Sequence, residues 1–225
     1  LSRLQGTEIG DIPPHEFVEV AENKGLIEKL GFVAFEKVCK FIADNKNLVD
    51  AVSINFSAYQ MTNPNLVSNV LETIFRFGLQ PSNIIMEITE SIFIENFELV
   101  KQNMTELAKS GVKFYLDDFG TGYSNLANVI GLPFSTIKID RSLVLMMEES
   151  KKGKDLFTNL ISTFKDSELN ILVEGVETNN QNYFVEKAGA DYIQGFLYSR
   201  PLPSEECIEL LKRQEEFINY CFFRR

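Results

Sequence analysis

Short apolar runs alternate with longer amphipathic segments along nearly the whole chain. Six of the runs contain the β-branched and aromatic residues that buried parallel strands favour. They span residues 51–56, 83–88, 112–116, 136–139, 170–173 and 192–193. Helical patterns occupy residues 14–25, 26–43, 65–77, 97–110, 155–165, 180–188 and 203–213, and Gly111 and Gly189 follow two of them, as C-terminal caps do. Repeated strand–helix alternation predicts a parallel sheet covered by helices.

The chain length favours a single α/β domain over residues 1–225. Six strands and an expected missing start fit a (β/α)₈ barrel better than an open sheet, although periodicity alone does not separate the two. No linker or low-complexity stretch divides the chain. The aromatic-rich end, residues 214–225, is expected to be either a last helix packed on the barrel or an extension that contacts a partner.

The net charge of −10 limits the classes of partner. Proteins that bind a DNA or RNA duplex usually carry a basic face, so we expect no duplex partner. Adhesion to anionic membranes is disfavoured for the same reason. A small anionic substrate is compatible with this charge only if a metal ion or local Lys and Arg residues reverse the field in the site.

The cysteines and the ends of the chain bear on location. Cys39, Cys207 and Cys221 are far apart and form no metal-binding pattern, which is typical of thiols in a reducing cytosol. No apolar run approaches the roughly 18 residues of a membrane helix. Because the chain begins at Leu1 without Met, we expect a fragment. It would be either a cytoplasmic protein or the cytoplasmic part of a membrane-anchored one.

Polar residues occur at or just after the ends of the predicted strands, where the chemistry of a barrel takes place. Any one of them alone would more often be a solvated or ion-paired group. Together they predict a site, because converging carboxylates repel each other unless cations lie between them. Oxygen ligands suit Mg²⁺ or Mn²⁺, and a single His (His15) without clustered Cys argues against zinc. The set comprises Asn55, Glu87, Glu90, Asp117, Asp118, Lys138, Asp140, Glu174, Glu177 and Gln194.

The segment DDFGTGYS, residues 117–124, is the most specific of these motifs. Adjacent side chains on a strand face opposite ways, so Asp117 and Asp118 can both face the site only if the strand breaks there. Gly120 and Gly122 permit such a break. A plain glycine-rich turn is the alternative.

At these residues the chain resembles the EAL domain family, bacterial hydrolases of the second messenger cyclic di-GMP. The similarity covers nearly the whole chain and runs in family order. Its markers are PHEF, AENKGLIEKLG, SINFS, MEITES, LDDFGTGYSNL, TIKIDRSLV, VEGVET and YIQGFLYSRPLP. The resemblance implies a TIM-like (β/α)₈ barrel with one reversed strand, and hydrolysis of cyclic di-GMP to linear pGpG.

The resemblance also implies a role for each matching residue. The metal ligands for two divalent cations, Mg²⁺ or Mn²⁺, would be Asn55, Glu87, Asp117, Asp118 and Glu174. Lys138 would lie near the attacking water and act in catalysis together with Asp117, Asp118 and Glu174. Arg3, Asp140 and Gln194 would contact substrate, and Glu90 and Glu177 would stabilise loops.

One departure from the family pattern concerns the start. The signature Glu would lie two positions before Leu1, and the first strand is absent, which we interpret as truncation. The resemblance further implies a homodimer and an upstream sensory or cyclase domain. Two alternatives stay open: a cyclic di-GMP receptor without catalytic activity, and an unrelated Mg²⁺-dependent barrel enzyme.

Overall fold

The computed structural model describes residues 4–7, 10–89, 96–121, 129 and 131–223. Its central feature is a six-stranded sheet in which every strand pairs in parallel with the next strand along the chain. The strands are β3 (Val52–Asn55), β4 (Ile84–Thr89), β5 (Lys113–Phe119), β6 (Thr136–Ile139), β7 (Asn170–Val173) and β8 (Tyr192–Ile193).

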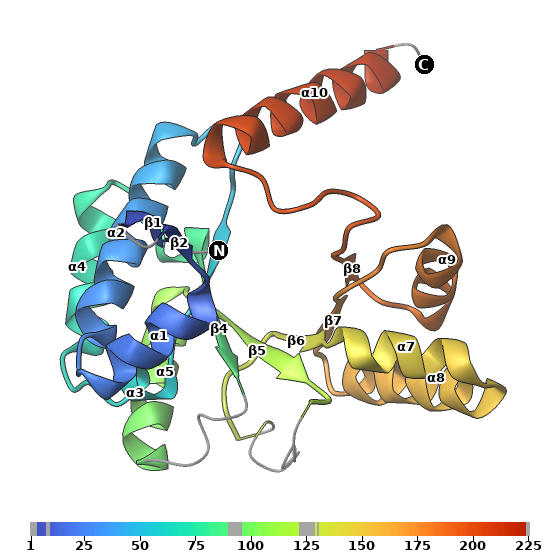
Figure 1. Cartoon of the computed structure of the whole chain (residues 1–225), viewed down its shortest axis with the longest axis horizontal. Helices are drawn as coiled ribbons and strands as arrows, with labels where there is room; N and C mark the ends of the chain where they lie inside the picture. Colours follow the sequence, from blue (N-terminus) through green and yellow to red (C-terminus); the bar gives the residue numbers. More distant parts are fainter. Residues whose placement is uncertain (1–3, 8–9, 90–95, 122–128, 130, 224–225) are drawn as a thin grey trace.

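This sheet curls into a half-barrel with helices on its outer face (Figure 1). All six strands lie within two or three residues of their predicted positions, and the predicted parallel α/β fold is confirmed. The structure is a partial (β/α)₈ barrel, and the reversed strand implied by the resemblance is not among these six.

Helices precede, connect and follow the strands of the sheet. They are α1 (Pro14–Asn23), α2 (Ile27–Asp44), α3 (Ala58–Met61), α4 (Leu66–Arg76), the 3₁₀ turn η1 (Pro81–Asn83), α5 (Phe97–Ser110), α7 (Arg141–Glu149), α8 (Lys151–Asp166), α9 (Asn179–Ala188) and α10 (Ser204–Phe223). Among the described helices, none has the length and apolar character needed to cross a membrane.

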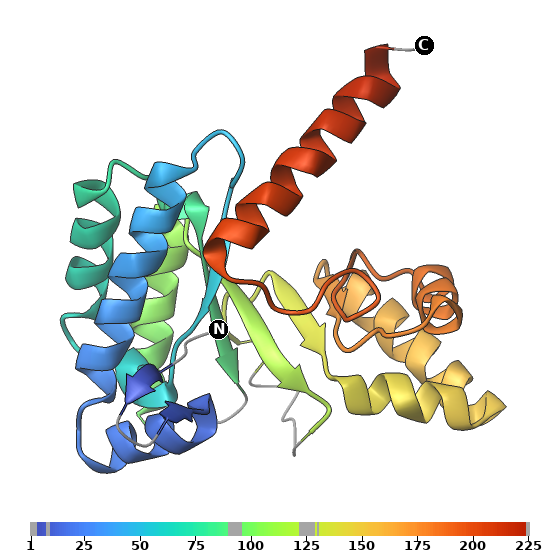
Figure 2. The ribbon, with the colours of Figure 1, turned by 45° about the horizontal axis from the view of Figure 1, so that its top comes forward.

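Three features were not predicted from the sequence. An antiparallel hairpin of β1 (Leu4–Thr7) and β2 (Gly10–Ile12) precedes α1. The short helix α3 and the helix α7 also lie between predicted elements. The chain end, which was expected to be a last helix or an extension, continues α10 as far as Phe223, and this helix projects away from the sheet and its helices (Figure 2).

The core lies between the sheet and the surrounding helices. All four residues of β6 are buried, and the large side chains of Phe35, Phe114 and Phe157 are fully enclosed. The predicted C-terminal caps are confirmed, since Gly111 and Gly189 adopt left-handed φ angles of 109° and 94°. Because all six strands are parallel, their carboxyl ends meet at one edge, and this is where the polar residues of the candidate site lie.

Candidate active site

A buried lysine lies at the centre of the acidic residues. Lys138 is on β6, and only 4% of it is exposed. Its Nζ lies 2.7 Å from Oδ1 of Asp117, 2.8 Å from Oε1 of Glu174 and 3.1 Å from Oε1 of Glu87. The ammonium group on β6 is therefore contacted by carboxylates from β4, from β5 and from the residue after β7.

The surroundings of Lys138 determine its charge. Burial alone would lower the pKa of the ammonium group, but the carboxylates of Glu87, Asp117 and Glu174 raise the pKa by more. Lys138 is therefore positively charged at neutral pH. An uncompensated charge at this depth would be costly, so the ammonium and its carboxylates stabilise one another.

The strand break expected at the Asp pair is present. The pairing of β5 with β6 is irregular between Leu116 and Phe119, and Asp118 has a left-handed φ of 56°. This conformation is uncommon outside glycine, although Asp tolerates it better than most residues. The backbone N–H of Asp118 donates to Oδ1 of Asp117 over 3.1 Å, and Gly120 follows with φ 106°. The two carboxyl groups are thus brought to the same side.

Three carboxylates are close enough to share a cation. One oxygen from each of Asp117, Asp118 and Glu174 lies within 4.8 Å of the others. Burial raises the pKa of Asp118, and the neighbouring Asp117 and Asp140 carboxylates raise it further. Burial also raises the pKa of Glu174, and it outweighs the attraction of Lys138.

The charges in this group do not balance, because Lys138 is one cation among the four carboxylates of Glu87, Asp117, Asp118 and Glu174. Lys138 forms ion pairs with Glu87, Asp117 and Glu174. An oxygen-only donor set with excess negative charge fits a divalent cation such as Mg²⁺ or Mn²⁺. Asp117, Asp118 and Glu174 are the residues that would hold it.

The other predicted ligands lie beside this group. Asn55 ends β3 and pairs in register with Glu87 on β4, so the two are neighbours across the sheet. Glu87 is buried, whereas Asn55 is exposed. The register therefore brings Asn55 to the same edge as the acidic residues.

The predicted substrate-contacting and loop residues have different surroundings. Asp140 caps α7, accepting a hydrogen bond of 2.8 Å from the N–H of Ser142. Burial opposes its ionisation, but hydrogen bonds from Ser142 lower its pKa overall. Gln194 is exposed directly after β8. Arg3 and Glu90 lie outside the described residues, as do residues 122–124 of the DDFGTGYS motif.

Two residues near the site were missed by the sequence reasoning. Arg141 forms an ion pair of 3.0 Å with Glu177, and no local pattern links positions so far apart. Gln181 is buried, and its Oε1 accepts the N–H groups of Glu177 and Thr178 over 2.7 and 3.0 Å. The spacing Thr178-x-x-Gln181 is a capping-box pattern that could have revealed the second of these.

Comparison with known proteins identifies the family. The model of the EAL domain matches residues 1–201. This chain belongs to the EAL domain family. The EAL domain is 32% identical to the bifunctional diguanylate cyclase/cyclic di-GMP phosphodiesterase MucR of Pseudomonas aeruginosa, over 92% of this chain and 31% of that protein. It is 32% identical to cyclic di-GMP phosphodiesterase PdeR of Escherichia coli, over 91% of this chain and 31% of that protein.

Solved structures agree with this assignment. PaMucR phosphodiesterase in complex with c-di-GMP superposes with a TM-score of 0.83 at 31% identity, covering 91% of this chain and 84% of that chain. The EAL domain spans about a third of the length of the curated relatives named above. The acidic group around Lys138 thus lies in a domain whose relatives include named cyclic di-GMP phosphodiesterases.

Proposed function

We propose that this EAL domain hydrolyses cyclic di-GMP to linear pGpG with the help of two divalent cations, Mg²⁺ or Mn²⁺. The observation that carries the proposal is the convergence of Asp117, Asp118 and Glu174 around buried Lys138 at the carboxyl edge of the sheet. Relatives at 32% identity are named cyclic di-GMP phosphodiesterases, which supports cyclic di-GMP as the substrate.

The ligands of the cations are proposed to be Asn55, Glu87, Asp117, Asp118 and Glu174. Bound divalent cations lower the pKa of water and neutralise charge on a phosphodiester. The Oδ1 atom of Asp117 contacts Nζ of Lys138 and accepts the N–H of Asp118, and Asp117 would be the best candidate for a carboxylate shared by both cations. Asp118 and Glu174 would complete the ligand set from either side.

Lys138 has a distinct role in this proposal. Without metal, the surrounding carboxylates raise its pKa, and a charged Lys138 would donate hydrogen bonds and offset developing negative charge. Arg3, Asp140 and Gln194 would contact the substrate, and Glu90 and Glu177 would stabilise the loops. For Asp140 this would be in addition to capping α7.

The setting of the domain is part of the proposal. MucR is bifunctional, and this chain covers only 31% of it, which supports an upstream sensory or cyclase domain. We further propose a homodimer in the cytoplasm, either free or as part of a membrane-anchored protein. The acidic net charge is compatible with a nucleotide substrate only because the cations and Lys138 supply local positive charge.

The decisive test is turnover of cyclic di-GMP to pGpG, followed by chromatography, with Mn²⁺ present. Asp117→Asn and Glu174→Gln should each reduce turnover by more than about 100-fold, because ligand placement within an ångström governs such reactions. Glu36→Gln removes an acid from the surface pair with Arg76 and should leave turnover unchanged. Binding of cyclic di-GMP without hydrolysis by the unmodified protein would instead establish a receptor, and activity in either site variant would refute the ligand assignment.

A further inference from the structure

The first residue of α7 lies against the segment that carries Glu174. A Cβ atom built on Gly175 would lie 2.5 Å from both Cβ and Cγ of Arg141, so the arginine stem passes directly over the glycine backbone. The arginine head continues to Glu177, where Nη2 lies 3.0 Å from Oε2. Arg141 therefore contacts the residue after Glu174 and a second residue two positions further on.

Backbone hydrogen bonds hold the same segment at the alternate positions. The N–H of Glu174 donates to the carbonyl of Ile139 over 2.9 Å. Val176 donates to Gln194 and accepts from Leu197, over 3.2 and 3.1 Å. Glu174 is thus tied to the end of β6 and Val176 to residues after β8, whereas the Arg141 side chain covers Gly175 and pairs with the side chain of Glu177.

The conformation of Gly175 explains why its contact with the Arg141 side chain matters. Its φ is +70°, a region that glycine enters freely and leaves as easily. A glycine hinge directly after a ligand would allow the Glu174 carboxylate to take several orientations. The stem of Arg141 fills the space into which the Gly175 backbone would otherwise move.

We propose that Arg141 is a positioning residue, which covers the backbone at Gly175, pairs with the side chain of Glu177 and thereby holds the Glu174 carboxylate toward Lys138 and Asp117. This inference rests on the proposed function for its consequence in catalysis. Partners that orient metal ligands without touching the metal are typically worth tenfold to a hundredfold in metal affinity or activity. Arg141 touches neither Lys138 nor a carboxylate of the metal group among the described contacts.

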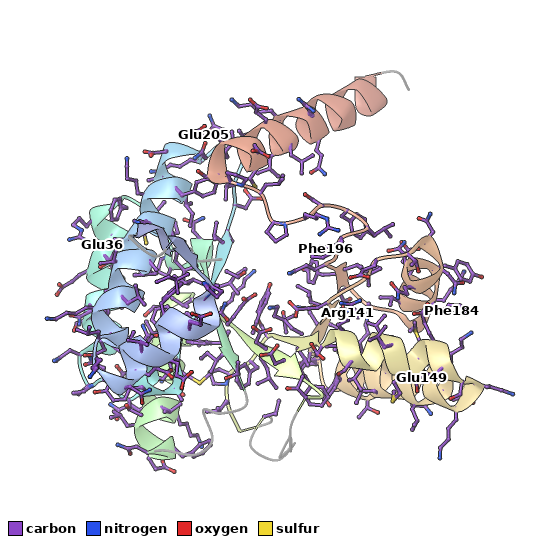
Figure 3. The ribbon with its side chains drawn as sticks, viewed as in Figure 1. Glu36, Arg141, Glu149, Phe184, Phe196 and Glu205 are labelled. Carbon is purple, nitrogen blue, oxygen red and sulfur yellow. The ribbon has the colours of Figure 1, made fainter. Side chains whose placement is uncertain are left out.

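The same ion pair should matter little for the stability of the fold. The side chain of Arg141 is 52% exposed, and exposed ion pairs contribute little to folding. Function and stability are therefore expected to separate when Arg141 is replaced. The chain offers a matched control in Arg76, which is 57% exposed and pairs with Glu36. Figure 3 places Glu36 on the opposite side of the molecule from Arg141.

The test compares Arg141→Ala, Arg141→Lys and Arg76→Ala with the unmodified protein. Mn²⁺ affinity is measured by electron paramagnetic resonance without substrate, thermal unfolding is followed with EDTA, and turnover is measured over a range of Mn²⁺ concentrations. Arg141→Lys retains the methylene groups over Gly175 and a positive charge, so it reports whether the arginine acts through this contact.

Arg141→Ala should weaken Mn²⁺ binding about tenfold, with a melting temperature within about 3 °C of that of Arg76→Ala. Its turnover should recover as Mn²⁺ is raised, and Arg141→Lys should restore most of the affinity. Unchanged Mn²⁺ affinity in Arg141→Ala, or a loss of affinity that Arg76→Ala shares, would overturn the inference. The proposed function and the positioning role can fail separately. If Arg141→Ala binds Mn²⁺ more weakly but the unmodified protein does not turn over cyclic di-GMP, the function is refuted and the positioning role is kept.

Discussion

Lys138 shows how one residue can serve both the fold and the site. It is 96% covered, yet it carries a charge, which is tolerated because Glu87, Asp117 and Glu174 surround its Nζ. Removing one member of a buried ionic group usually costs more than the group contributes as a whole, because the remaining charges are left unpaired. The site residues of this EAL domain are therefore also structural residues in the absence of metal.

Replacement of Lys138 by Met should expose this double role. The raised pKa of Lys138 means that its contribution is fully present below the ordinary lysine pKa near 10.4 and is lost only as pH rises beyond its folded value. In EDTA at pH 7, we expect Lys138→Met to lower the free energy of unfolding by about 3 kcal/mol or more. Urea denaturation measures this loss. A stability equal to that of the unmodified protein would show that the carboxylates need no internal cation.

The substitution Glu174→Gln should become less destabilising as pH rises. Because burial raises the pKa of Glu174, its contribution to stability is present below the unfolded pKa near 4.3 and is lost as pH rises through the folded pKa. In EDTA, the stability of Glu174→Gln relative to the unmodified protein should therefore increase as pH rises from about 4 to 7. Urea denaturation at several pH values tests this, and a relative stability that falls with pH would contradict the assignment.

At the scale of elements, the sequence predicted the strands of the sheet and several of the helices well. The strands at residues 136–139 and 170–173 and the helix at 97–110 have the predicted ends. The helix α7 was missed because its apolar residues form one continuous run at residues 143–147 without helical spacing. The hairpin of β1 and β2 was missed because LQGT and GDI contain few of the β-branched and aromatic residues that strands favour.

At the junction of α7 and α8, helix propensity and packing predict opposite effects of one substitution on stability. Gly153 is inside α8, where Ala would ordinarily be favoured by about 1 kcal/mol. A Cβ at Gly153, however, would lie 2.1 Å from the carbonyl oxygen of Met146, a backbone atom that cannot easily move. We expect Gly153→Ala to destabilise the domain by about 1–3 kcal/mol.

Thermal unfolding measures this effect, and Gly189→Ala is the control. Gly189 has a left-handed φ of 94° but open space around its Cβ position, so its replacement reports conformational strain without a clash. Stabilisation by Gly153→Ala would show that the two helices can separate enough to admit a methyl group.

At the scale of the whole molecule, the sequence predicted that Glu87, Asp117 and Lys138 lie close together but not how they share charge. Parallel strands bring their carboxyl ends together, so the grouping of Glu87, Asp117 and Lys138 followed from strand positions alone. Two details depend on the local break in β5. Lys138 contacts three carboxylates, and Asp118 itself takes the left-handed conformation. Such details arise from packing across the sheet and have no signature in the order of residues.

Metal binding should stabilise the entire domain against thermal unfolding. A ligand at about 100 times its dissociation constant stabilises the folded state by about 2.7 kcal/mol. We therefore expect saturating Mn²⁺ or Mg²⁺ to raise the melting temperature by roughly 5–10 °C, and Asp117→Asn to abolish the shift. An equal shift in that variant would place the metal elsewhere.

Ca²⁺ should distinguish metal binding from hydrolysis of cyclic di-GMP. Its preferred oxygen distances of about 2.3–2.6 Å exceed the 2.0–2.1 Å of Mg²⁺, and its coordination is looser. The same carboxylates should bind Ca²⁺ and raise the melting temperature, whereas excess Ca²⁺ should inhibit turnover of cyclic di-GMP supported by Mn²⁺. Turnover with Ca²⁺ alone at the rate seen with Mn²⁺ would contradict the placement argument.

The strictly sequential order of the six parallel strands has a consequence for how the chain acquires its structure during synthesis. Within the described part of the chain, each of β4 to β8 pairs with the strand made just before it, so these strands have a partner as soon as they leave the ribosome. Loop closure between neighbouring units is short compared with that of a sheet whose first and last strands pair. The half-barrel can therefore grow one strand and helix at a time, and Lys138 acquires its last carboxylate only when Glu174, after β7, has been added.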